Sequence, residues 1–244
     1  MTATGGSDPH PLALQRGILL GAVAGTVVAA WWYVVASGHR MVGGQQGDLL
    51  VAVPVWAAMM TGMMLPGAAP MFAAYAQVNG RSGGRWAPLA GFVGAYLALW
   101  IGVSVLGAFV QQHLIATGVL SPMGHSLHPL LSAAALLIAG AYQFTPLKEA
   151  CLRRCRTPLG FLLTEWRPGT PGALRLGWRH GLECLLCCWA FMVLMFVLGA
   201  MNLIWMALLT VVMLVEKAAP AGRAIGRWCG ALLIGAGLIV GLHT

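Results

Sequence analysis

The sequence predicts an all-α protein, a polytopic integral membrane helix bundle with about seven transmembrane helices. Of its 244 residues, 59% are hydrophobic and 8% are charged, whereas soluble domains carry roughly 25% charged residues. The spans must be helices, because hydrocarbon cannot hydrogen-bond a bare backbone and the short alternating segments of a barrel are absent. So apolar a chain leaves no room for a sizeable soluble domain.

Seven apolar stretches follow one another along the chain, each near the roughly 20 residues that a span requires. We expect a disordered tail over 1–15, which lacks the basic start of a signal peptide, and one membrane domain over 16–244. The expected spans cover 16–36, 49–76, 87–111, 127–146, 178–198, 202–217 and 224–242, and a basic cytoplasmic loop covers 147–177.

The fifth and sixth spans are divided by a predicted turn. One continuous helix over 178–217 would run for roughly 60 Å, about twice the hydrocarbon thickness. The segment from Gly199 to Asn202 supplies turn-forming residues at its midpoint. We therefore expect two spans here.

The positions of the basic residues predict the orientation. With seven spans, only Arg40 of the fourteen lysines and arginines lies on the face opposite the N-terminus. Because cytoplasmic loops are enriched in basic residues, the N-terminus is expected inside and the C-terminus outside. The net charge of +8 thus reflects membrane topology, and we expect the lipid bilayer, with no nucleic acid, as a partner.

Candidate metal ligands gather on one face of the fifth span. The three cysteines at positions i, i+3 and i+4 share this face of a helix. A glutamate beside them is a functional candidate, since ionisable residues are costly inside a membrane. The predicted ligands on this span are His180, Glu183, Cys184, Cys187, Cys188 and Met192.

The second span holds a matching run of methionines. Met60, Met63 and Met64 lie near its middle. Thioether and thiolate ligands select soft ions, above all Cu(I). We therefore predict a Cu(I) site between the second and fifth spans. In the alternative reading, the methionines fill packing gaps and the cysteines are ordinary small buried residues.

Two further groups of soft or borderline ligands lie outside this pair of spans. Cys151 and Cys155 are i,i+4 neighbours on the basic loop, where they form an inner metal site or a redox pair; alternatively, this segment meets anionic lipid. No cysteine lies in an outer loop, so a disulfide framework is not expected. Outer histidines that can capture a borderline ion, but more commonly bind nothing, are His113, His125 and His128.

Three motifs together resemble a bacterial family called predicted metal-binding integral membrane proteins. They are MMTGMMLP at 59–66, YQFTPLK at 142–148 with the two loop cysteines, and GLECLLCCW at 181–189 leading to GAMNL at 199–203 and to Glu216-Lys217. The resemblance covers roughly residues 50–240. The family is a domain of unknown function whose members are sometimes labelled copper chaperones, and it implies metal binding in the bacterial inner membrane.

The sequence favours a copper-handling inner-membrane protein that binds Cu(I) through Cys and Met side chains and relays or supplies it to a protein partner. One alternative is a non-catalytic integral subunit or assembly factor of a larger membrane metallo-oxidoreductase; another is a transmembrane thiol–disulfide electron carrier. A different transition metal or haem remains an alternative to copper, although a c-type haem attachment motif is absent. Without a phosphate-binding glycine loop or a Ser/His/Asp arrangement, the chain is expected to have no catalytic activity of its own.

Overall fold

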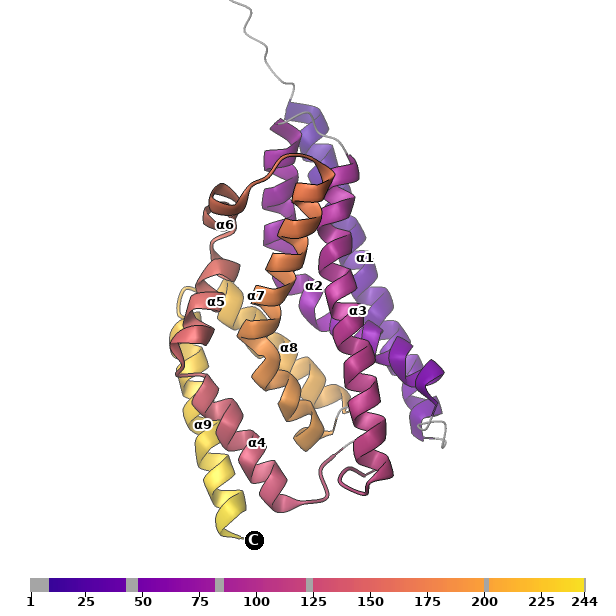
Figure 1. The fold of residues 1–244 in the computed structure, drawn as a ribbon, viewed down its shortest axis with the longest axis vertical. Coiled ribbons are helices and arrows are strands. Elements are labelled where there is room, and N and C mark those ends of the chain that lie inside the picture. Colours follow the sequence, from indigo (N-terminus) through magenta and orange to yellow (C-terminus); the bar gives the residue numbers. More distant parts are fainter. Residues whose placement is uncertain (1–8, 43–47, 82–85, 122–124, 200–201, 244) are drawn as a thin grey trace, which may run out of the picture.

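The computed structural model of the chain describes residues 9–42, 48–81, 86–121, 125–199 and 202–243, and confirms the all-α fold class (Figure 1). Within these ranges there are nine helices and no strand beyond one isolated bridge. The helices are α1 (Pro9–Val42), α2 (Leu49–Arg81), α3 (Trp86–Ala116), α4 (Pro129–Tyr142), α5 (Pro146–Arg156), α6 (Pro158–Glu165), α7 (Gly169–Leu198), α8 (Leu203–Ala218) and α9 (Gly222–Leu242).

Several of these helices match the expected spans. By length and composition, α1, α2, α3, α7 and α9 can each cross a membrane, and α4 with α5 forms a sixth candidate that is bent by 62°. The expected sixth span corresponds to α8, which has 16 residues and is shorter than the helices of that set. The chain thus has five or six candidate spans among its described residues, and the total of seven remains a prediction.

Two separate helices, α7 and α8, cover the fifth and sixth expected spans. Helix α7 ends at Leu198, and the following Gly199 has a φ of +96°, which glycine adopts without strain. Asn202 then caps α8, because its side-chain oxygen accepts hydrogen bonds from the backbone N–H groups of Ile204 and Trp205. The chain therefore forms two helices here.

The other expected boundaries differ in places. Helix α1 begins at Pro9, inside the expected tail, of which residues 1–8 lie outside the described ranges. The expected basic loop 147–177 contains most of α5, all of α6 and the first turns of α7. In Figure 1, α6 lies near the upper end of the bundle, and the C-terminus lies at the lower end.

Helix α7 occupies a central position, where it packs closely against α3. A Cβ atom added to Gly177 would lie 2.1 Å from the carbonyl oxygen of Phe92, so this contact requires glycine. The bundle exposes large apolar side chains on its outside, such as Trp32 and Leu50, which are 75% and 83% exposed. Its thiols and methionines lie mostly inside, as expected for a bundle whose outer surface faces lipid.

Candidate metal centre

Three thiols lie together on the buried face of α7. Cys184, Cys187 and Cys188 are all at most 3% exposed. The thiols of Cys187 and Cys188 each donate a hydrogen bond to the backbone oxygen of Cys184, at 3.0 Å. The described cysteines are all free thiols. The helical spacing of these residues thus produces a compact group of thiols.

Methionine sulfur from α2 reaches this group. The Met64 Sδ lies 3.8 Å from the Cys188 Sγ. Metal–thiolate bonds measure about 2.3 Å for zinc, so two sulfurs that share an ion lie at most about 4.6 Å apart. The two side chains therefore lie within the separation that a shared soft ion requires.

A fourth thiol comes from α5. The Cys155 side chain is buried and lies near that of Cys187, where α5 packs against α7. The sequence predicts that Cys151 and Cys155 form an inner pair separate from the α7 thiols. In the structure, Cys155 lies near the α7 thiols and Cys151 is buried nearby. We call Met64, Cys155, Cys184, Cys187 and Cys188 the sulfur cluster.

A lysine and a tyrosine, both missed as site residues by the sequence analysis, contact this cluster. The Nζ of Lys217, from α8, lies 3.1 Å from the Cys184 Sγ, and its positive charge would attract each of the four thiols once ionised. The Tyr96 hydroxyl lies 3.3 Å from the same Sγ and donates to the backbone oxygen of Met64. Residue type and spacing did not mark Lys217 as a ligand or site residue, although its place in the third motif was a signal that it matters.

Glycine makes room for this lysine. A Cβ atom added to Gly67 of α2 would lie 3.0 Å from the Cδ of Lys217 and 3.4 Å from its Nζ. The backbone of α2 can therefore approach the lysine side chain closely.

The predicted histidine and glutamate of α7 have different surroundings. His180 is 2% exposed, neither of its ring nitrogens has a hydrogen-bond partner, and its ring stacks on that of Tyr96 with centroids 5.4 Å apart. Its nitrogens are thus available to an ion. The Glu183 Oε1 instead forms ion pairs with Arg154 at 2.6 Å and Arg179 at 3.7 Å.

The remaining predicted ligands lie in two different environments. Met60, Met63 and Met192 are buried in the surrounding hydrophobic core. The His125 ring forms a hydrogen bond with Ser121 at 2.8 Å. Across the described part of the chain, no group of three or more His, Cys, Asp or Glu side chains adopts metal-ligating positions. The cluster is therefore a set of neighbouring sulfurs, not a preformed metal cage.

A buried ion pair adjoins the cluster. The Lys148 Nζ lies 2.9 Å from both carboxylate oxygens of Glu216, and it also donates to the Gln143 side chain. A Cβ atom at Gly226 would lie 2.6 Å from the Glu216 Oε1, so glycine makes room for this carboxylate. Consecutive residues of α8 thus make two connections: Glu216 to α5, and Lys217 to the thiols of α7.

Comparison with known proteins agrees with the resemblance. A family model described as PpoB2, copper chaperone, matches residues 53–240, about three quarters of the chain. No curated protein and no solved structure matches. The matched range contains the whole sulfur cluster and both residues of the Glu216-Lys217 pair. The match supports a copper-related role, and the chain belongs to the PpoB2 copper chaperone family.

Proposed function

We propose that this protein is an inner-membrane copper chaperone that binds Cu(I) at the sulfur cluster and supplies it to a protein partner. The observation that carries the proposal is the approach of Met64 to Cys188, which joins the sulfurs of α2 and α7 inside the bundle. Soft sulfur ligands select Cu(I), and the family description supports copper as the cargo.

The charge around the cluster suits a monovalent ion. Two thiolates that hold Cu(I) carry one negative charge in excess, and an uncompensated charge is costly in an apolar interior. The ammonium group of Lys217 lies beside Cys184 and provides the opposite charge. It would thus stabilise the loaded site.

The number of sulfurs suits transfer. Two to four ligands suffice for a Cu(I) ion, whereas the cluster offers five sulfurs from α2, α5 and α7. An ion can therefore exchange one ligand at a time without being released into hydrocarbon. Cys155 lies on α5, in the basic segment that we infer to be cytoplasmic, so exchange at this thiol would link the cluster to that face.

Copper content tests the binding step. The full chain is purified in mild detergent under reducing, oxygen-free conditions, loaded with Cu(I), and analysed for metal. The unaltered protein is expected to hold copper near stoichiometry, and the triple variant Cys184→Ala/Cys187→Ala/Cys188→Ala to lose most of it. Cys229→Ala is the matched control, since Cys229 lies outside the cluster. Unchanged copper in a folded triple variant would contradict the proposal.

Transfer to a partner is tested separately. The copper-loaded protein in mild detergent is mixed with membrane extract, and proteins that co-purify with it are identified and analysed for copper. We expect a transient partner that gains copper as this chain loses it. A permanent stoichiometric complex in which the copper stays on this chain would instead favour a resident subunit of a larger enzyme.

A further inference from the structure

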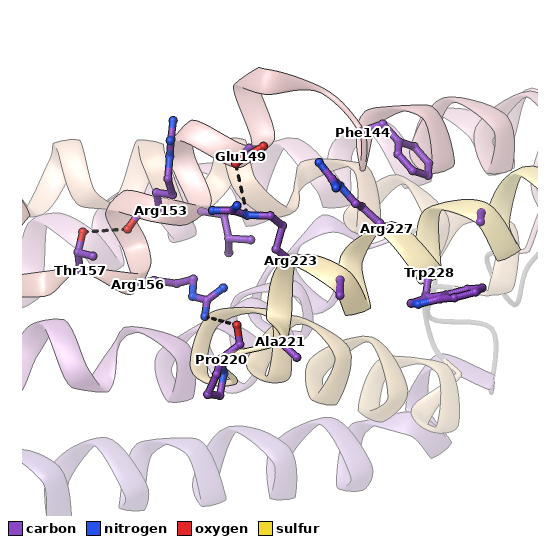
Figure 2. A pocket seen from close by; sticks show the side chains of 13 residues that line it. Phe144, Glu149, Arg153, Arg156, Thr157, Pro220, Ala221, Arg223, Arg227 and Trp228 are labelled. Atoms are coloured by element: carbon purple, nitrogen blue, oxygen red, sulfur yellow. Dashed lines mark hydrogen bonds and ion pairs between the residues drawn. The ribbon is translucent and has the colours of Figure 1, made fainter.

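A pocket lies between α5 and α9, and the residues that line it are all outside the sulfur cluster (Figure 2). Its volume is about 850 Å³, within the roughly 300–1,000 Å³ that is common for ligand pockets. The side chains that matter for its chemistry are Phe144, Arg153, Arg156, Arg223, Arg227 and Trp228. Neither the copper site nor the family description accounts for this pocket.

The pocket has an excess of positive charge. Its lining includes four arginines and one carboxylate, that of Glu149, which pairs with Arg223 at 3.3 Å. Arg156 donates to the backbone oxygen of Ala219 at 2.5 Å, a contact that leaves its charge uncompensated. Across the described ranges, neither Arg153 nor Arg227 forms an ion pair, and Figure 2 shows both side chains at the pocket. Guanidinium groups in such a site match the oxygens of a phosphate group.

The apolar side of the pocket distinguishes a lipid from a soluble anion. Trp228 and Phe144, both in the lining, are 72% and 51% exposed. Trp residues concentrate at membrane–water interfaces. Beyond Trp228, the outer face of α9 continues with Leu232 and Ile239, which are 71% and 60% exposed. A molecule with a phosphate at the arginines and an acyl chain along α9 would contact both parts.

We propose that this pocket binds the phosphate group of an anionic phospholipid. Basic pockets between transmembrane helices on the cytoplasmic side recognise such headgroups. A smaller cavity shares Glu149, Arg223 and Arg227 with the pocket and reaches Lys148 and Glu216. The bound lipid would therefore hold α5 against α9 next to the buried ion pair.

Selective lipid retention tests the site. The full chain, delipidated in neutral detergent, is incubated with equal amounts of phosphatidylglycerol and phosphatidylcholine, and bound lipid is measured by native mass spectrometry. We expect at least a fivefold preference for phosphatidylglycerol, lost in Arg153→Gln/Arg227→Gln. Arg167→Gln/Arg175→Gln is the control, since it removes the same charge at a different surface site. Equal retention by the pocket variant and the unaltered protein, or equal loss in the control, would overturn the proposal.

Thermal unfolding distinguishes a lipid from a free phosphate. Phosphatidylglycerol is expected to raise the unfolding temperature of the unaltered protein, but not that of the pocket variant. Glycerophosphate and inorganic phosphate at the same concentration are expected to have no effect. If either raises it as much as the lipid does, the pocket accepts soluble phosphate and the lipid assignment is wrong. If the pocket variant without lipid unfolds at a lower temperature than the unaltered protein, both measurements are repeated with the single variant Arg227→Gln.

Discussion

Lys217 of α8 and Cys184 of α7 lie side by side inside the bundle, with the Nζ 3.1 Å from the Sγ. The ammonium group thus lies beside a thiol group that becomes negatively charged when it binds metal. This arrangement makes Lys217 a positioning and charge-balancing residue of the proposed copper site, and it leads directly to a prediction.

Replacing the lysine should weaken copper binding. Two opposite charges about 4 Å apart attract by roughly 4 kcal/mol at an effective dielectric constant of 20, and relaxation reduces this gain. We expect Lys217→Met to lower Cu(I) affinity by about tenfold or more, and Lys217→Arg to retain part of it. Competition with a coloured Cu(I) chelator measures both. Arg16→Gln, at an exposed position, is the control for general charge loss, and an unchanged affinity in Lys217→Met would contradict this role.

The thioether of Met64 should matter through its sulfur and not its volume. Met64→Leu conserves volume, so its cost in stability should stay below about 1.5 kcal/mol. Its Cu(I) affinity should nevertheless fall severalfold, because the sulfur beside Cys188 is gone. Met71→Leu, at an equally buried position of the same helix, should leave the affinity unchanged. Equal affinities in the two variants would identify Met64 as a packing residue.

The space at Gly67 should control the position of the lysine. In Gly67→Ala the new methyl group would lie 3.0 Å from the Lys217 Cδ, so the flexible side chain must shift. We expect a smaller loss of Cu(I) affinity than in Lys217→Met. The unfolding temperature should change little, because the cost of shifting the lysine is offset by the helix propensity of alanine, which is about 1 kcal/mol more favourable than that of glycine. An affinity loss as large as that of Lys217→Met would instead indicate disruption of the α2–α8 contact.

The buried Lys148–Glu216 pair should be important for stability. Its side chains are 4% and 3% exposed, so removal of one partner leaves an unpaired buried charge. We expect Lys148→Met to destabilise the protein by about 3–5 kcal/mol, and the added change Glu216→Gln to recover much of that loss. Denaturant unfolding in detergent measures both variants. If the double variant is no more stable than the single one, the charge of Glu216 is not the cause.

Local features of the fold were predictable from the sequence. The helix period alone places Cys184, Cys187 and Cys188 on one face, and α7 ends at Leu198, directly before the residues that the sequence predicts to form a turn. The boundaries of α5, α6 and α7 were harder to predict from the sequence. Their basic residues suggested a loop, whereas ion pairs such as Arg154–Glu183 and Arg179–Glu165 connect them as packed helices.

The sequence by itself determined the all-α class, the apolar helices, and the residues that share the thiol face of α7. The tertiary structure decided which residues meet this face: Met64 of α2, out of several methionines, Cys155 of α5, and Lys217 of α8. Local periodicity sets which face of a helix carries a side chain. Which side chain of another helix it contacts depends on how the helices are rotated and how closely they approach. Both arise from packing between segments as far apart in sequence as Met64 and Cys188.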